Sequence, residues 1–205
     1  KRLVELMRSI DLPTGWLAFD VPAPTGRPPG VATAIDRDDA QDWWDEAAVA
    51  KHRAMMHDRH RERVDAMVAA GETFVGTIYR RKRDGTTRAE VRFDGVAGCL
   101  RTPRGGSARQ IVVVAEAGRL RMRWMSPREY ARLQGAPDFP LTGNTVQDLF
   151  GFGDAVCVPV VQWIDRHVLT PAAASIARRT PRGRQPDARP APADDAGGER
   201  EEHVA

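Results

Sequence analysis

The sequence predicts a mixed α/β fold with two β-hairpins, several short helices and a disordered tail. Residues 73–93 and 110–125 each place strand-forming side chains on both sides of a turn signal. Residues 43–70 and 126–135 combine the apolar spacing of helices with recognisable helix ends. After residue 170 large apolar side chains are almost absent, so this segment cannot bury enough surface to become ordered. With 41% hydrophobic residues in 205, the rest of the chain can form a modest core.

The first seventy residues are predicted to be irregular at the start and helical at the end. The end of a helix is expected at residues 1–10, and five prolines between residues 13 and 29 predict a loop. Two helices are expected within residues 43–70, and Asp58 is expected to cap the second.

Tryptophan and histidine side chains in this helical stretch could form a base-stacking site or a metal site, but the sequence favours neither. Trp43 and Trp44 are interpreted as packing residues, with stacking on nucleic-acid bases as the alternative. His52, His57 and His60 do not have the spacing of a zinc site, and no cysteine accompanies them. We therefore expect these histidines on a solvated helix face, and no metal site is predicted.

Residues 73–93 predict a hairpin with strongly basic arms. Asp84-Gly85 is a strong signal for a two-residue hairpin turn. The arms carry six cations, which are Arg80, Arg81, Lys82, Arg83, Arg88 and Arg92. A basic β-ribbon can lie along a phosphate backbone, but charges on an edge strand also protect a hairpin from aggregation. The residues alone leave both roles open.

A glycine-rich loop follows at residues 94–107. Its small residues allow backbone N–H groups to approach a phosphate, while Arg101 and Arg104 supply positive charge. Cys99 in the same loop is interpreted as structural.

Residues 110–125 predict a second hairpin. Residues 111–114 form an apolar run that predicts a buried strand, and residues 116–118 predict its turn. The second arm then alternates arginine with Leu120, Met122 and Trp124. Because side chains alternate across a strand, Arg119, Arg121 and Arg123 are expected on one face, either solvated or part of a DNA-binding cleft.

Residues 126–135 predict a helix with well-defined ends. Ser126 is a favoured N-cap, Pro127 fits the first helical position, and Glu129 completes a capping box. Gly135 is placed to end the helix.

Two more helices are expected towards the C-terminus. The first covers residues 142–150, with Asn144 or Thr145 near its start, and a tight turn is expected at 151–153. The second begins at Pro159, and its buried stripe is expected to comprise Val160, Val161, Ile164 and Val168.

Composition excludes several classes of protein. No apolar run is long enough to span a membrane, and no signal peptide is visible. The two cysteines, Cys99 and Cys157, lack metal-ligand spacing, which fits a reducing cytoplasm. A net charge of +3 is compatible with a nucleic-acid partner.

Two motifs, in this order, resemble signatures of the C5-cytosine DNA methyltransferases. The first family pattern reads roughly Thr/Ser-x-Arg-Glu-x-x-Arg-Leu-Gln-Gly-Phe-Pro-Asp, and residues 126–138 match every named position except the Phe, which is Ala136. The second reads Phe-Gly-Asn-Ala/Ser-Val-Pro before an apolar helix. Residues 152–159 match it, with Asp154 for Asn and Cys157 for Pro. The resemblance covers about residues 95–169.

The resemblance implies a Rossmann-like α/β catalytic domain joined to a smaller recognition domain. This chain would supply a target-recognition region (1–125), the C-terminal return to the catalytic domain (126–170) and a disordered tail (171–205). The implied reaction transfers a methyl group from S-adenosyl-L-methionine to carbon 5 of a flipped-out cytosine in double-stranded DNA.

The resemblance also assigns candidate site residues. Cofactor contacts would fall on Asp154, Ala155 and Val156, which close over the methionine end of the cofactor. The DNA contacts are expected on the basic hairpin and the glycine-rich loop, at Arg80, Arg81, Arg83, Arg101, Thr102, Arg104, Gly105 and Gly106.

Several family motifs do not occur in the sequence: the glycine-rich cofactor loop, the Pro-Cys nucleophile, the Glu-Asn-Val motif and an Arg-rich motif. The chain is therefore expected to be the C-terminal half of such an enzyme, inactive alone and completed by a catalytic half in the same or a separate chain. No catalytic residue is assigned. A non-catalytic DNA-binding module, a split-enzyme subunit and an inactive remnant are the alternatives. The bacterial cytoplasm, in association with the nucleoid, is the expected location, and restriction-modification is the expected context.

Overall fold

The computed structural model describes residues 5, 6, 9, 20–26, 29–83, 85–103 and 108–179. The chain divides into two units. Ala18–Val168 contains the sheet and most helices, and the other unit consists of Lys1–Leu17 and Leu169–Ala205. Most of the helix end predicted at residues 1–10 lies outside the described residues.

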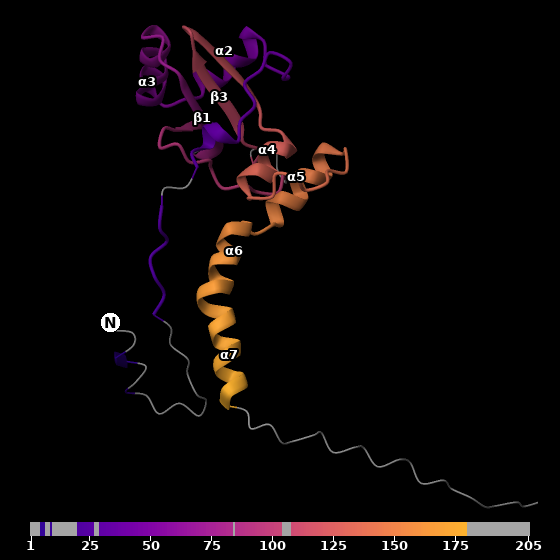
Figure 1. Cartoon of the computed structure of the whole chain (residues 1–205). Coiled ribbons are helices and arrows are strands. Elements are labelled where there is room, and N and C mark those ends of the chain that lie inside the picture. The colour runs from indigo at the N-terminus through magenta and orange to yellow at the C-terminus, as the bar shows by residue number, and fades with distance from the viewer. Residues whose placement is uncertain are drawn as a thin grey trace, which may run out of the picture. The chain divides into compact units, whose positions relative to one another are not determined.

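The larger unit is built on a four-stranded antiparallel sheet in the order β2-β1-β3-β4 (Figure 1). The first hairpin pairs β1 (Phe74–Arg83) with β2 (Thr86–Arg92), and the second pairs β3 (Ile111–Glu116) with β4 (Arg119–Trp124). Both predicted hairpins are thus confirmed, as is the mixed α/β class.

The two hairpins join through β1 and β3. Their pairing runs from Phe74 opposite Ala115 to Ile78 opposite Ile111. Beyond this point β1 continues with β2 as far as Arg83, so its second half extends past the end of β3.

Strand β3 is the centre of the core, because both of its faces are covered. Residues 111–115 are all buried, as predicted for this apolar run. Alternate side chains enter two different clusters: Ile111 and Val113 contribute to one, and Val112 and Val114 to the other. The sheet is therefore the middle layer of three.

The first outer layer is formed by α2 (Glu46–Ala54) and α3 (Asp58–Ala69), which lie against the sheet in Figure 1. Val64 of α3 is fully buried in this cluster. Trp44 packs here as well, edge-on to Trp124 with ring centroids 5.2 Å apart. The packing interpretation of the tryptophans is confirmed. The cap of α3 is His57 rather than the predicted Asp58.

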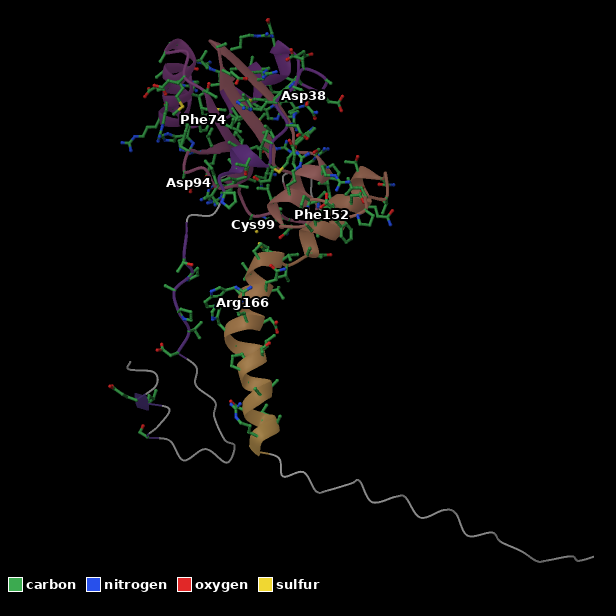
Figure 2. The ribbon with its side chains drawn as sticks, viewed as in Figure 1. Asp38, Phe74, Asp94, Cys99, Phe152 and Arg166 are labelled. Carbon is green, nitrogen blue, oxygen red and sulfur yellow. The ribbon has the colours of Figure 1, made fainter. Side chains whose placement is uncertain are left out.

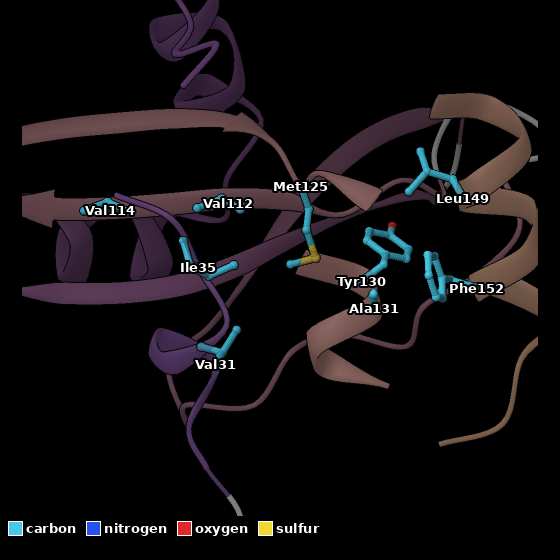
Figure 3. Close-up of a cluster of buried hydrophobic side chains, with 9 residues drawn as sticks. All are labelled: Val31, Ile35, Val112, Val114, Met125, Tyr130, Ala131, Leu149 and Phe152. Carbon is cyan, nitrogen blue, oxygen red and sulfur yellow. The ribbon is translucent and has the colours of Figure 1, made fainter. Parts of the chain in front are cut away.

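The second outer layer is formed by η1 (Val31–Thr33), α4 (Pro127–Leu133) and α5 (Thr145–Asp154). Figure 3 shows this cluster, in which Tyr130 of α4 stands next to Leu149 and Phe152 of α5. Both predicted helix starts are confirmed. Ser126 and Glu129 form the capping box, and the Asn144 side chain caps α5.

The predicted tight turn at residues 151–153 was wrong. Helix α5 continues through these residues to Asp154. Leu149 and Phe152 are three positions apart, so one helical face carries both into the core. That burial outweighs the low helix propensity of the two glycines.

The predicted buried stripe on the last helix was also wrong for the residues of α6 (Val158–Ile164), none of which is buried. Val160, Val161 and Ile164 are 50%, 44% and 38% exposed. The sequence places these side chains on one helical face, but no element among the described residues of the larger unit covers that face. A short π-helical segment, η2 (Asp165–Leu169), follows α6.

The smaller unit contains α7 (Thr170–Arg179), and its described residues Glu5, Leu6 and Ser9 are also helical. The disordered tail was predicted to begin at residue 171, so this boundary was placed too early. Three consecutive alanines, 172–174, favour a helix without requiring a core. The tail from residue 180 lies outside the described residues.

His52 is buried instead of solvated, contrary to the prediction for the helix face. Its ring stacks on Trp44 with centroids 4.3 Å apart, and its Nδ1 lies 2.9 Å from the Ala48 carbonyl oxygen. Burial lowers the pKa of His52, and the nearby charges of Arg80 and Lys51 lower this pKa further.

Stability is therefore expected to decrease in mild acid. The unfolded chain takes up a proton at His52 near pH 6.5, whereas the folded chain resists it, so the free energy of unfolding falls as pH drops below that value. Urea unfolding at pH 7.5 and 5.5 measures this loss. His52→Phe keeps an aromatic ring against Trp44 and should show a smaller loss. An equal pH dependence in the variant would contradict the assignment.

Candidate nucleic-acid interface

Three hydrogen bonds fix the predicted DNA loop to η1, to β1 and to the residue that precedes β3. The Val31 N–H donates to the Gly95 carbonyl oxygen at 2.7 Å, and the Gly98 N–H donates to Thr77 Oγ1 at 3.2 Å. Gln110 Nε2 donates to the Cys99 carbonyl oxygen at 3.2 Å. Figure 2 labels Asp94 and Cys99, at the start and in the middle of this loop. The loop therefore has a defined position beside the second half of β1.

A basic hollow of about 400 Å³ lies between that half of β1 and the loop. Five cations line it: Arg80, Arg81, Lys82, Arg92 and Arg101. The remaining lining residues are uncharged: Tyr79, Gly98, Cys99, Ala108 and Gln110. Three of the predicted DNA contacts, from two separate segments, thus lie around one hollow whose described lining residues include no carboxylate.

The five cations differ in how strongly they are engaged. Arg92 pairs with Asp94, and Arg81 Nε lies 3.9 Å from Glu90 Oε1. Arg80 lies over the Trp124 ring at 4.8 Å, and burial lowers the pKa of its guanidinium. Lys82 and Arg101 are exposed and have no ion-pair partner among the described residues. Of the five cations, Lys82 and Arg101 are therefore the most accessible to a bound anion.

Some predicted contacts cannot be placed. The backbone of Arg83 belongs to β1, but its side chain lies outside the described part, as do Arg104, Gly105 and Gly106. Thr102 is half-buried at the edge of the loop. Lys82 and Arg92 line the same hollow but were not among the assigned contacts, although both belong to the same basic arms as Arg80. Their charge was the signal that could have identified them.

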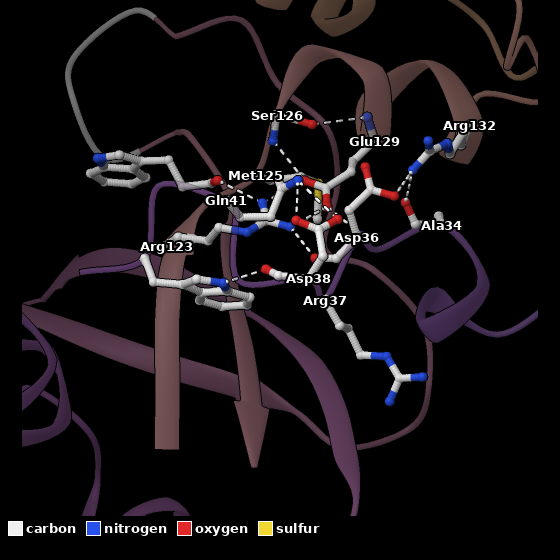
Figure 4. Close-up of polar contacts among 12 residues, drawn as sticks. Ala34, Asp36, Arg37, Asp38, Gln41, Arg123, Met125, Ser126, Glu129 and Arg132 are labelled. Carbon is white, nitrogen blue, oxygen red and sulfur yellow. Dashed lines mark hydrogen bonds and ion pairs between the residues drawn. The ribbon is translucent and has the colours of Figure 1, made fainter. Parts of the chain in front are cut away.

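The arginine face of β4 is not part of this interface. Arg123 is 2% exposed and forms a double ion pair with the fully buried Glu129, at 2.5 and 2.8 Å (Figure 4). Arg121 pairs with Asp39 at 2.8 Å and with Glu116 at 3.3 Å. The prediction of a solvated or DNA-facing surface was therefore wrong for these two arginines, which are neutralised within the fold.

The predicted cofactor residues lie where α5 ends. Asp154, Ala155 and Val156 are all exposed, and Val156 is 65% exposed. Their backbone is tied to α4, because Gln134 Nε2 donates to the Phe152 carbonyl oxygen at 3.0 Å and to that of Ala155 at 3.5 Å.

Ala155 also lines a second hollow of about 380 Å³, together with Leu133, Gln134 and the loop residues 95–100. Gly98 and Cys99 line both hollows, so the loop separates them. Ala155 is the residue of the segment 154–156 that is found in this lining, so the segment can contribute to one side of a bound molecule here. Its three residues do not enclose one, so they fit a cofactor only as part of a larger site.

The cysteines, the possible metal ligands and the helix lengths indicate no further site among the described residues. Cys99 is exposed, Cys157 is half-buried, and both are free thiols. The described residues bring together no group of three or more histidine, cysteine or carboxylate side chains that could hold a metal ion. Within the same residues, no helix has both the length and the apolar character needed to cross a membrane.

Comparison with known proteins gives one match. Residues 37–169, more than half of the chain, match the family model described as C-5 cytosine-specific DNA methylase. No match was found among curated proteins or among solved structures.

Proposed function

The chain belongs to the C-5 cytosine-specific DNA methylase family, and we propose that it is the DNA-recognising, C-terminal part of a DNA (cytosine-5-)-methyltransferase. The basic hollow is the observation that carries this proposal. It gathers five cations from β1, β2 and the loop after β2, and none of the described residues that line it is a carboxylate. Such a concentration of positive charge favours a polyanion, and phosphates of double-stranded DNA are the polyanion that the family acts on.

The phosphate contacts would position the duplex rather than read its sequence. Lys82 and Arg101 are the first candidates, because they are exposed and no described carboxylate forms an ion pair with either of them. Arg80 and Arg81 would add charge from the same strand. The reaction of the complete enzyme would methylate carbon 5 of a cytosine rotated out of the duplex.

Methyl groups in this family come from S-adenosyl-L-methionine. We place Asp154, Ala155 and Val156 at one side of that cofactor, and the rest of its site would belong to the catalytic half. The fixed backbone of this segment, held by Gln134, supports the assignment. No residue of this chain is assigned a catalytic role.

The exposed apolar face of α6 supports a missing catalytic half. Three large side chains on one helical face are between 38% and 50% exposed, and such a contiguous apolar surface is typical of an interface. We propose that residues 1–125 form the target-recognition region and that residues 126–170 return to the catalytic half. We further place the enzyme in the bacterial cytoplasm, at the nucleoid, as the modification partner of a restriction nuclease.

Salt-dependent DNA binding by the purified chain tests the proposal. Each phosphate contact contributes about 0.9 to the slope of log K against log salt concentration. Arg101→Gln and Lys82→Gln are each expected to weaken binding and to reduce this slope by about that amount. Fluorescence anisotropy with a duplex oligonucleotide, between 50 and 200 mM salt as a rough range, measures both quantities.

Arg119→Gln is the matched control for these variants. It removes the same charge from an exposed arginine at the turn between β3 and β4, at the opposite end of β3 from the hollow. Equal losses in all three variants would indicate bulk charge rather than a site. No binding at all would favour an inactive remnant, and methyl transfer by the isolated chain would contradict the assignment of a separate catalytic half.

A further inference from the structure

Gly153 packs directly on the backbone of the DNA loop. A Cβ atom added at Gly153 would lie 2.6 Å from the Arg101 carbonyl carbon, 2.7 Å from Thr102 Cα and still closer to the Thr102 nitrogen. Real Cβ atoms essentially never approach other atoms this closely, and a backbone cannot turn aside as a flexible side chain can. The missing side chain at position 153 is therefore what allows α5 and the loop to meet.

The neighbouring Gly151 has no such requirement. It belongs to the same helix, and a Cβ atom added there would meet nothing within 4 Å. Neither glycine has a positive φ angle, so alanine is conformationally acceptable at both positions. The two sites differ only in what lies beside them.

The loop is also fixed from its other side. Gln110 donates to the Cys99 carbonyl oxygen, and a Cβ atom added at Gly98 would lie 3.1 Å from Gln110 Cδ. Arg101 and Thr102 therefore lie between an anchor on the sheet side and the surface of α5. The segment immediately after Gly153 is the one assigned to the cofactor.

We propose that Gly153 is a positioning residue for the DNA-contacting loop, so that the end of α5 sets where the Arg101 charge is presented in the basic hollow. With respect to DNA, this inference rests on the proposed function. The same short segment would then serve two sites: its glycine supports the DNA loop, and the next three residues cover the cofactor.

Gly153→Ala tests this role, with Gly151→Ala as its control. In Gly153→Ala the loop is expected to be displaced, so amide hydrogen exchange of residues 98–102 in the free chain should accelerate about tenfold or more. Gly151→Ala should leave this exchange unchanged. DNA affinity is expected to fall about tenfold in Gly153→Ala, with the same reduction in salt slope that Arg101→Gln produces.

A double-mutant cycle then separates positioning from general damage. If Gly153 acts through Arg101, adding Arg101→Gln to Gly153→Ala should cause little further loss of affinity. Additive losses, or unchanged exchange in the loop, would overturn the proposal. Global unfolding of the single variant Gly153→Ala would also contradict it, because the proposal requires a local displacement of the loop in a chain that stays folded. If the wild-type chain binds no DNA, the proposed function fails, and loop exchange alone still decides the role of Gly153.

Discussion

Replacing Glu129 with alanine is expected to lower the free energy of unfolding by about 3–5 kcal/mol. Glu129 is fully buried and accepts four hydrogen bonds (Figure 4). Two come from Arg123, one from the Ser126 N–H at 2.7 Å and one from the Asp36 N–H at 3.0 Å. The substitution would leave the Arg123 guanidinium buried without a counter-charge and would leave the half-buried N–H groups of Ser126 and Asp36 without their acceptor.

Urea unfolding followed by circular dichroism measures this loss. A double variant, Arg123→Met with Glu129→Leu, is the informative control, because it removes both charges and fills similar volume. We expect it to recover much of the loss of Glu129→Ala. A loss below about 1 kcal/mol in the single variant would show that the pair is dispensable.

The capping box at Ser126 illustrates what local sequence could predict. Cap, turn and hairpin signals depend on residues within a few positions of one another, and those at Ser126, Asn144 and the two hairpins were all confirmed. Glu129 was identified as part of this cap. Its second role could not be inferred, because the Asp36 N–H that it accepts from lies 93 positions away.

Three of the errors share one physical cause. Periodicity indicates which side chains lie on one face, but it does not indicate what covers that face. The arginines of β4 were correctly placed on one side, yet the buried Glu129 covers one of them. Residues 151–153 were assigned to a turn from their glycines, whereas the burial of Phe152 keeps them helical. The valine face of α6 was expected to be buried, and the described residues of the larger unit offer nothing to bury it.

For the candidate site, too, the sequence indicated local features but not the contacts between distant segments. The sequence supplied the cations of β1 and the loop, and the resemblance supplied their role. That Arg101 lines the same hollow as Arg80 and Arg81 became evident only from the structure. The second half of β1 extends past its pairing with β3, and the loop lies next to this unpaired half. The contact between Gly153 and Thr102 joins segments about fifty positions apart and has no local signal.

Charging the apolar face of α6 is expected to abolish methyl transfer by the complete enzyme while leaving DNA binding by this chain intact. The variant is Val161→Asp with Ile164→Asp, at positions 44% and 38% exposed. Since both side chains are solvent-accessible in this chain, carboxylates there should cost its own fold little. If the face is covered by the catalytic half, the same carboxylates would be buried without partners in that interface. About 3 kcal/mol or more of lost association energy corresponds to a loss of at least about a hundredfold in assembly.

Gln162→Asp is the matched control for this variant. It introduces a carboxylate on the same helix, but a period of 3.6 residues places position 162 about 160° around the helix from Ile164 and about 100° from Val161, outside the apolar face. Methyl transfer into duplex DNA, measured with the N-terminal catalytic half joined in the same chain or supplied separately, should therefore survive Gln162→Asp. Equal activity in both variants would show that α6 is not part of the interface with the catalytic half. Equal loss in both would point to added negative charge acting on DNA, and loss of DNA binding by the isolated chain would establish that reading.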